Sequence, residues 1–512
     1  MITVLILAPL VVPVLGALGY AVLGWRRATA WGSAGSAAVV LASAITVAVD
    51  VSRAGPHTAA AGLLRVDALS AFMLVVIGAV ALLATTATPT YLATEIEAGR
   101  ATARTATRHS VLVQLFLAAM ALAVLAADLG VVWVAIEATT IVTAFLVGQR
   151  RTRAAVEAAW KYVVICSAGI ALALLGTILL NFAATHAPGA AGLNLAALAA
   201  NAGGLDPGVT QIAVALLILG FGTKAGLAPL HAWLPDAHSQ APAPVSALMS
   251  GVLLSVAFYA ILRVKVIADA ALGTGFARTL LAVMALASLL LAASLILAQR
   301  DYKRMLAYSS IEHLGLVALG AAIGGPLALA AVLLHILGHG LAKAVLFLGA
   351  GRILQVTGTS RIDTEDLLAG SSIVAVRGLA GRHPVLAGGI GFGVLALIGL
   401  PPFSLFASEL GIARAGFAEG MGWQTAAALV LVLVIAAALV GHTSRMLLGD
   451  PPSDPLSDPP GGPGAATMPS RLPRPAVVAL AGGLVACAAL GISTGPLSSL
   501  LHSATDILVG AP

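Results

Sequence analysis

A lysine inside an apolar run is the residue of this sequence that points most directly to ion chemistry. Lys224 follows an apolar stretch that begins at Ile212. A lysine at the depth of a bilayer costs roughly 3 kcal/mol on insertion scales. Gly222, Gly226 and Pro229 flank it, which predicts a broken or irregular helix. Broken membrane helices beside ionisable groups are typical of ion sites, so we expect Lys224 to belong to one.

A second group of ionisable residues stands in the segment LLHILGHGLAKAVLF. It places His335, His339 and Lys343 at intervals of four residues. On a helix these side chains share one face, each about 6 Å above the last. Two imidazoles and an ammonium in a row are the composition expected of a proton or ion wire. The histidine spacing would also permit metal ligation, but no HExxH pattern or third ligand accompanies it, so we expect no metal site. A static helix–helix contact is the remaining alternative.

Three carboxylates, Glu137, Glu312 and Glu409, also lie inside apolar runs. Glu137 is a candidate partner of Lys224, and the pair could either move protons or only hold two helices together. The main proton-translocation candidates are therefore Glu137, Lys224, His335, His339, Lys343 and Glu409. The secondary candidates lie near the ends of the runs or after Lys224, and they are Lys161, His231, Asp236, His238, Glu312 and His313.

Simpler interpretations apply to several secondary candidates. Lys161 stands one turn after Glu157, so an ordinary ion pair is as good an interpretation as a functional one. Glu312 and its neighbour border the membrane interface, where structural and functional roles are equally expected. Asp236 and His238 are expected in the loop after the Lys224 span, where they could take up protons or simply be solvated.

The elements that would carry these residues are membrane-spanning helices. The 512 residues are 60% hydrophobic and only 9% charged, whereas a soluble domain carries about 25% charged residues. A segment at 190–203 is short and amphipathic, and we expect it to lie at the interface. Apolar stretches near the roughly 20 residues that cross a bilayer recur fourteen times, near 2–24, 31–50, 68–92, 110–127, 129–148, 160–184, 209–230, 244–263, 279–299, 305–324, 326–350, 385–411, 423–447 and 475–496.

Lys and Arg residues are distributed unevenly among the connections. Those after odd-numbered spans hold most of them, including Arg104, Arg300, Lys303 and Arg304. This excess predicts that the odd connections are cytoplasmic and that both termini lie outside a cell membrane. The overall charge of +6 follows from it and does not argue for nucleic-acid binding. The first apolar run precedes Arg26 rather than following a basic segment, so we expect it to stay in the mature protein.

The two cysteines, Cys166 and Cys487, are far apart and neither stands in a CxxC pattern. An iron–sulfur cluster needs about four thiolates. We therefore expect no cofactor and no redox centre in this chain, and both thiols are interpreted as small buried apolar groups. The stretch 450–474 is rich in Pro and Gly, which predicts a flexible loop, and no connection is long enough for a soluble domain.

A weak internal symmetry relates two groups of five spans. Spans 4–8 carry Glu137, then Lys161, then the broken Lys224 helix, while spans 9–13 carry Glu312, then Lys343, then a broken helix in GLPPFSLFASEL. Two five-helix units with matching breaks are the signature of inverted-repeat transporters. We divide the chain into 1–109 (three helices), 110–268 (first repeat), 269–449 (second repeat) and 450–512 (loop and last helix).

Four motifs together resemble the antiporter-like membrane subunits of respiratory complex I, Mrp-type cation/proton antiporters and membrane-bound group 4 hydrogenases. They are GTKAGLAPLHAWLPDAHSQAPAPVSALMSG, QRDYKRMLAYSSIEHLG, LLHILGHGLAKAVLFLGAG and GLPPFSLFASE. SSIEHLG resembles the hydrogenase-4 component F branch in particular. The resemblance implies about fourteen helices, two inverted five-helix bundles, breaks in helices 7 and 12, and a hydrophilic axis at the membrane midplane.

The same resemblance implies roles for single residues. Glu137 matches the glutamate that pairs with the lysine of span 7, here Lys224. Lys343 matches the lysine of span 11, and Glu409 matches the ionisable residue of span 12 at the exit to the next subunit. Several relatives carry a lysine in span 8 where this chain has Ser255 or its neighbours. The relay is then expected to pass from Lys224 through water or His339 and His335 of span 11, and then to Lys343 and Glu409.

The expected function is proton translocation in a complex-I-like or hydrogenase-type oxidoreductase, coupled to redox events on other subunits. The expected partners are antiporter-like paralogues, NiFe-hydrogenase-like and iron–sulfur subunits, and the lipid bilayer. A cation/proton antiporter or inorganic-carbon-uptake subunit without a redox partner is the main alternative. A purely structural subunit is a third. The chain also ends soon after span 14, so we expect it to lack the long lateral helix of the largest family member.

Overall fold

The computed structural model describes residues 2–188, 192–362, 365–366, 372–373, 376–449 and 472–510. Thirteen helices of this described part are long and apolar enough to cross a membrane. The remaining predicted span, the twelfth at 385–411, is divided into two shorter helices on either side of a break. The all-helical membrane fold is therefore confirmed. Most of the stretch expected as a loop, 450–474, lies outside the described residues.

The long helices are α1 (Ile2–Leu23), α2 (Gly32–Ala54), α3 (Ala68–Glu97), α4 (Ala103–Leu125), α5 (Leu129–Val147), α6 (Arg153–His186), α8 (Pro207–Ala225), α11 (Leu254–Leu272), α12 (Thr274–Leu297), α13 (Tyr302–Ile323), α14 (Gly325–Thr357), α18 (Gly422–Leu448) and α19 (Arg474–Ile492). The shorter helices are α7 (Leu195–Ala200), α9 (Trp233–Gln240), α10 (Ala243–Leu248), α15 (Leu379–Arg382), α16 (Pro384–Leu397), α17 (Ser404–Ala418) and α20 (Ser498–Val509). Single turns η1 (Ala60–Gly62), η2 (Gly148–Arg150), η3 (Ala202–Gly204), η4 (Met249–Leu253) and η6 (Gly495–Leu497), and two antiparallel pairs, β1 (His57–Ala59) with β2 (Leu64–Val66) and β3 (Glu365–Asp366) with β4 (Ser372–Ile373), complete the described elements.

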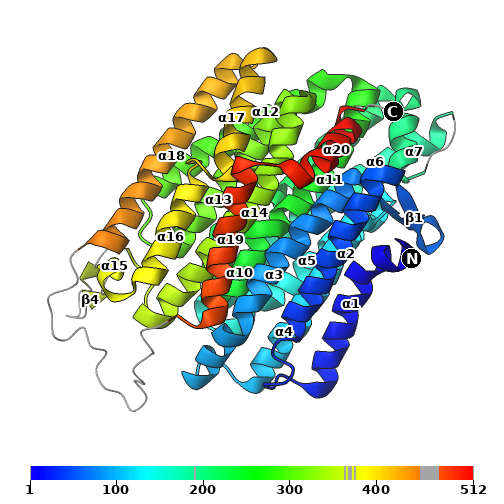
Figure 1. Ribbon diagram of the computed structural model, residues 1–512. Helices are drawn as coiled ribbons and strands as arrows, with labels where there is room; N and C mark the ends of the chain where they lie inside the picture. The colour runs from blue at the N-terminus through cyan, green and yellow to red at the C-terminus, as the bar shows by residue number, and fades with distance from the viewer. Residues whose placement is uncertain are drawn as a thin grey trace.

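Helix α14 lies at the centre of the bundle (Figure 1). It packs against α3, α10, α13, α16, α17, α19 and α20. The most apolar stretches of α13, α14 and the α10–α11 span are wholly buried, whereas only 22% of the corresponding stretch is buried in α1 and in α19. A helix that is buried on all sides has no aqueous face, so any ionisable residue on α13 or α14 must find its partners inside the protein.

The first break separates α8 from α9. Gly226 ends α8 in the left-handed region at φ +80°, and its N–H bonds back to the carbonyls of the last turn. The indole of Trp233, at the start of α9, donates to the carbonyl of Thr223 at 2.9 Å. Asp236 and His238, which we expected in a loop, therefore lie on a helix. Helical periodicity could not predict α9, because this helix is only eight residues long and begins after an irregular segment.

The second break separates α16 from α17 and supports a carboxylate. Gly399 stands there at φ +67°. A Cβ at this position would lie 2.3 Å from Oε2 of Glu409. The left-handed backbone conformation favours glycine here, and the absence of a Cβ leaves room for the Glu409 carboxylate beside it.

The eighth span contains a local irregularity next to α14. Its π-helical turn η4 joins α10 to α11. There Gly251 and Gly340 meet backbone to backbone: a Cβ on Gly340 would lie 2.6 Å from the Gly251 carbonyl oxygen. Single π-turns inside helices frequently mark functional positions, and this one lies beside His339, the residue that precedes Gly340.

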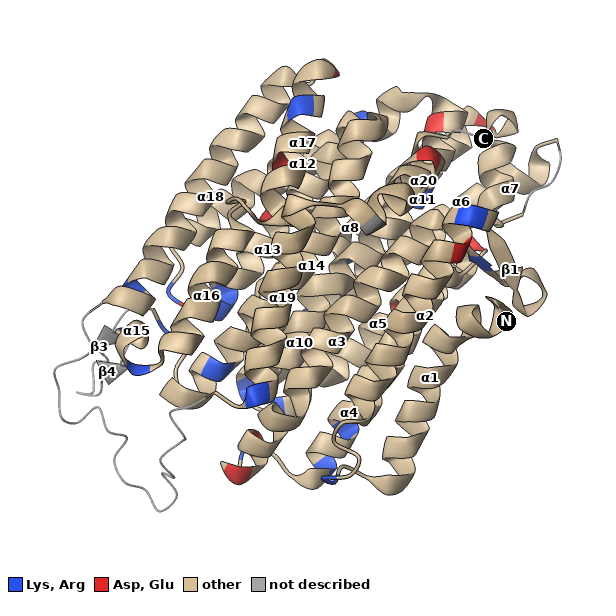
Figure 2. Cartoon of the chain, in the orientation of Figure 1, with Lys and Arg blue, Asp and Glu red and all other residues tan. Residues whose placement is uncertain are grey.

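Figure 2 shows Lys and Arg gathered mainly at the end of the bundle where α4 begins and α18 ends. Some of the basic residues that we assigned to connections between spans are buried in helices instead. Lys265, Lys303 and Arg352 lie inside α11, α13 and α14 and are buried. Their burial gives these three residues structural or functional roles beyond setting orientation.

A buried ion pair at the opposite end joins α3 to α11. Asp67 caps the N-terminus of α3 by accepting from the N–H of Ser70 at 3.0 Å, and one of its oxygens lies 2.6 Å from Nη2 of Arg263. Burial raises the pKa of Asp67, but the attraction of Arg263 and hydrogen bonds from Arg263 and Ser70 outweigh it, so the pKa is lowered. This carboxylate is therefore held in its charged form.

We expect Asp67→Ala to lower the free energy of unfolding by about 3–5 kcal/mol, because Arg263 would stay buried without its partner. Asp206→Ala is the matched control. Asp206 is exposed and caps the N-terminus of α8 by accepting from the N–H of Val209, and losing such a cap costs only about 1 kcal/mol. Unfolding of the purified protein in detergent measures both, and equal losses would contradict the buried pair. The Asp67 contribution should be present above the ordinary aspartate pKa and disappear as the pH falls through the lowered value.

Candidate functional site

Neutral hydroxyl groups surround Lys224, which lies fully buried in the last turn of α8. Its ammonium donates to Oγ1 of Thr140 on α5 at 2.9 Å and to the hydroxyl of Tyr162 on α6. The ammonium also lies 4.6 Å from the centre of the Tyr162 ring. The Tyr162 hydroxyl lies 2.5 Å from Oγ1 of Thr143. The charge is thus solvated by the side chains of two neighbouring helices.

Glu137 lies on α5, one turn before Thr140. In the described part of the chain no ion pair joins it to Lys224, although its charge is near enough to act on that lysine. Its Oε2 is buried and has no hydrogen-bond partner among the described residues. Val134 and Ile141 on the same helix are exposed. Glu137 therefore lies toward the lateral surface of the bundle, and the direct pair with Lys224 stays a prediction.

Asp236 ties the short helix α9 to two neighbours. Its carboxylate pairs with Lys161 of α6 at 3.2 Å and with Arg304 of α13 at 3.1 Å. Lys161 also pairs with Glu157 at 2.7 Å. These groups are partly exposed, so each pair contributes little alone, but together they fix α9 between α6 and α13. His231 stands apart in the break itself, where partial burial lowers its pKa.

His238 lies on the buried side of α9. It is fully buried, and its ring stacks on Phe347 of α14 with centroids 5.4 Å apart. Neither ring nitrogen has a hydrogen-bond partner among the described residues. The charges of Lys343 and Lys303 both act on it. A buried imidazole whose two nitrogens are both free can accept a proton at one nitrogen and donate a proton from the other.

Lys343 on α14 is solvated in the same way as Lys224. Its ammonium donates to the carbonyl oxygen of Leu306 at 2.7 Å and to Oγ of Ser309 at 2.6 Å, both on α13. Glu312 lies on α13 one turn after Ser309 and is also buried. Its Oε2 has no hydrogen-bond partner within the described ranges, while its charge acts on Lys343. The lysine and the carboxylate are thus near one another without an ion pair between them.

Three histidines form a connected group between α13 and α14. Nδ1 of His313 lies 3.0 Å from Nε2 of His335, and Nδ1 of His335 lies 2.9 Å from Oγ of Ser408 on α17. The ring of His339 lies 5.1 Å from that of His313. Nε2 of His313 and of His339 has no partner in the described part of the chain. The structure thus brings His313, a secondary candidate, together with two of the main candidates.

Glu409 lies at the far side of this histidine group. Its Oε1 is buried without a hydrogen-bond partner among the described residues. One donor atom each of His313, His335 and Glu409 lies within 4.8 Å of the others, a set that could also hold a metal ion. The sequence could not show this set, because its members come from three different helices.

The eighth span offers hydroxyl groups where several relatives were expected to carry a lysine. Ser255 is fully buried, and its hydroxyl has no partner within the described residues. Oγ of Ser250 lies 2.7 Å from Oγ of Ser310 on α13, one residue from the Ser309 that binds Lys343. Serine hydroxyls therefore line this helix–helix contact beside the ionisable groups.

The residues that sequence reasoning missed are mostly neutral. Thr140, Tyr162, Ser309 and Ser408 bind the ionisable groups, but hydroxyl residues are common in membrane helices and their type gives no signal. Lys303 was assigned to a connection because it stands beside other basic residues. Only the helix packing shows that its side chain is buried.

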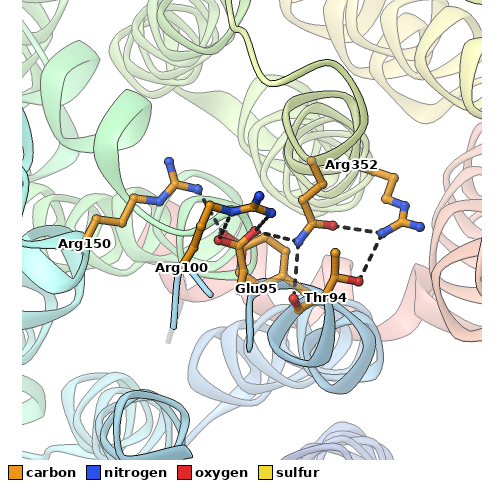
Figure 3. A network of polar contacts seen from close by, with 7 residues as sticks. Thr94, Glu95, Arg100, Arg150 and Arg352 are labelled. Carbon is orange, nitrogen blue, oxygen red and sulfur yellow. Dashed lines mark hydrogen bonds and ion pairs between the residues drawn. The ribbon is translucent and has the colours of Figure 1, made fainter. Parts of the chain in front are cut away.

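A separate polar network ties the basic ends of α3 and α14 (Figure 3). Glu95 receives two hydrogen bonds from Arg100, at 3.0 and 3.1 Å, and one from Gln355 at 2.9 Å. Arg352 donates to Gln355 at 3.0 Å and contacts Thr94. In this network Glu95 and Arg100 form a direct ion pair, whereas Lys224 and Lys343 form none with a carboxylate among the described residues. We therefore interpret the network as a structural connection between α3 and α14.

Comparison with known proteins agrees with this arrangement. A family model described as NADH:quinone oxidoreductase/Mrp antiporter, transmembrane, matches residues 126–436. The hydrogenase-4 component F homolog of Methylacidiphilum infernorum (isolate V4) is 41% identical over 367 residues, which cover 71% of this chain and 74% of that protein.

Two solved structures share the fold over nearly the whole chain. A chain of the membrane-bound sulfane sulfur reductase, an archaeal respiratory membrane complex, has a TM-score of 0.83 at 25% identity, with 99% of this chain and 98% of that chain covered. A chain of the Mrp complex from Dietzia sp. DQ12-45-1b has a TM-score of 0.82 at 23% identity, with the same coverage. The protein therefore belongs to the NADH:quinone oxidoreductase/Mrp antiporter transmembrane family.

Proposed function

We propose that this chain is a proton-translocating subunit of a complex-I-like or group 4 hydrogenase-type membrane oxidoreductase. The observation that carries this proposal is the row of buried ionisable groups between the two broken helices. It starts at Lys224, beside the first break, and ends at Glu409, beside the second. Buried charges at membrane depth that lack fixed partners mark ion pathways.

The geometry favours one order of groups along this row. Phe347, Lys343, His339 and His335 follow one another on α14 at intervals of one turn, about 6 Å each. His238 stacks on Phe347, so it lies nearest to the Lys343 end. A proton from the first break would then meet Lys343 before the histidines. The sequence alone suggested that the histidines come first.

The proposed coupling is electrostatic. A redox event on another subunit changes the charge near Glu137, at the lateral surface of the bundle. This change weakens or strengthens the attraction between Glu137 and Lys224. Lys224 is bound by hydroxyls that solvate an ammonium and also tolerate a neutral amine, so its proton can leave. The proton then passes through His238, Lys343 and the histidine group to Glu409.

We expect partner subunits at two positions on the lateral surface of the bundle, one beside Glu137 and one beside Glu409. Glu137 lies beside exposed apolar residues of α5, and Glu409 lies on α17 beside exposed Phe406 and Leu410. A carboxylate at such an edge is costly against lipid and is stabilised by a polar partner. The names of the relatives, a hydrogenase-4 component and a respiratory membrane complex, support redox subunits as those partners.

We further propose that the chain lies in the cell membrane with its basic end in the cytoplasm and both termini outside. The asymmetry of Lys and Arg among the connections supports this orientation (Figure 2). A cation/proton antiporter or inorganic-carbon-uptake subunit is the alternative function, supported by the fold shared with the Mrp complex. Purifying the chain under mild conditions and identifying its copurifying subunits distinguishes the two.

Neutralising the first pair should uncouple the complex. We expect Glu137→Gln or Lys224→Ala to reduce proton translocation by the intact complex at least about tenfold, since relay groups contribute roughly 10²–10⁴ in rate. Protons moved per substrate turned over, in proteoliposomes, is the measurement. Glu157→Gln is the matched control, because Glu157 is exposed and lies outside the buried row. Normal pumping by both main variants would disprove this mechanism.

A purely structural role makes a different prediction for the second half of the row. We expect the double variant Lys343→Met with Glu409→Gln to assemble and to lose proton translocation, because both side chains keep similar volumes while losing their charges. Blue native electrophoresis reports assembly, and the proteoliposome assay reports translocation. Loss of assembly with unchanged translocation in the remaining complex would instead support a structural subunit.

A further inference from the structure

Lys303 is a buried lysine that the proposed relay does not use. It stands in the first turn of α13 and is 1% exposed. Its ammonium donates to the carbonyl oxygens of Ser239 at 2.6 Å and Ala241 at 2.9 Å. Within the described residues no carboxylate forms an ion pair with it. The two carbonyls lie at the C-terminal end of α9, where the helix leaves its last acceptors unpaired and favours a cation.

This contact places Lys303 next to a proton acceptor. Ser239, whose carbonyl accepts from the Lys303 ammonium, directly follows His238. Both ring nitrogens of His238 are buried and have no partner in the described part of the chain. The ring of His238 stacks on Phe347 of α14, one turn after Lys343. One buried amine therefore adjoins the first imidazole of the proposed row.

We propose that Lys303 loads the buried row by passing a proton to His238. This inference rests on the proposed function and adds the donor that supplies it. In the step, one N–H bond of the Lys303 ammonium breaks and an N–H bond forms at a ring nitrogen of His238 through a bridging water, since neither ring nitrogen has a direct hydrogen-bond partner among the described residues. The products are a neutral amine and an imidazolium.

The number of donors allows this step without moving α9. An ammonium has three N–H groups, and two of them bind the carbonyls of Ser239 and Ala241. The third is available for transfer, and the amine that remains keeps two N–H groups for the same two carbonyls. The total charge around His238 is unchanged, because the lysine loses the charge that the imidazole gains. Onward transfer from the imidazolium requires Lys343 as a neutral amine, whose lone pair accepts the proton.

Partly exposed polar groups of α9 and its neighbours lie close to Lys303 at the basic end of the bundle. Asp236 and Ser239 are three residues apart and share a face of α9. Asp236 is partly exposed and pairs with Arg304, the residue after Lys303, and with half-exposed Lys161. Water at this end can therefore return a proton to the Lys303 amine along the surface of α9. The carboxylate of Asp236 attracts that proton.

Lys303→Arg tests loading against simple anchoring. A guanidinium keeps the charge and the donors for both carbonyls but does not release its proton. We expect the variant complex to assemble and its protons per turnover to fall at least about tenfold. Lys265→Arg is the matched control: Lys265 is also buried and paired, on α11, but lies outside the row, so pumping should be unchanged. Full pumping by Lys303→Arg would overturn the proposal and leave Lys303 as an anchor.

Two further variants complete the experiment. Lys303→Gln keeps amide donors for the carbonyls without a titratable proton, and it should lose pumping as the arginine variant does. If neither variant assembles, Lys303 is a structural anchor and the proposal fails. Lys224→Ala in the same assay separates the two hypotheses. If it abolishes pumping while Lys303→Arg does not, only the loading role fails; if it too leaves pumping unchanged, the proposed function itself fails.

Discussion

Solvation of buried charge by neutral oxygen atoms is the interaction on which the interior of this protein depends. Lys224 is bound by hydroxyls, Lys343 by a hydroxyl and a carbonyl, and Lys303 by two carbonyls. A contact ion pair would hold each lysine in its charged form, since removing one partner of such a pair is strongly unfavourable. Neutral acceptors stabilise the ammonium less, so the proton can be lost without leaving a buried carboxylate unpaired.

The carboxylates complement this arrangement. Glu137, Glu312 and Glu409 each have one buried oxygen without a hydrogen-bond partner among the described residues. Glu137 and Glu312 stand near Lys224 and Lys343 without an ion pair to them, at distances where a change of one charge alters the other. Glu409 lies beside the histidine group instead. At the bundle ends the opposite holds: Asp67 and Glu95 form direct pairs with arginines. Charges in direct contact thus hold the helices together, and separated charges lie along the proposed row.

Glycines at close contacts allow the helices that carry the buried ionisable groups to pack together. The contact of Gly251 with Gly340 brings the eighth span against α14, and Gly399 leaves room for Glu409. The first break places Lys224 at a helix end and lets α9 carry His238 into the interior. Each irregular segment therefore adjoins an ionisable side chain, which agrees with the rule that non-helical backbone at membrane depth lines a functional site.

The sequence by itself determined the number of spans, the broken helices and most of the ionisable candidates, because hydropathy and helical periodicity are local properties. It also showed that His335, His339 and Lys343 share one face. Only the tertiary structure decided which groups meet across helices: Tyr162 with Lys224, His313 with His335, and Lys303 with α9. These contacts depend on how α6, α9, α13 and α14 pack, and no local pattern of residue types encodes that packing.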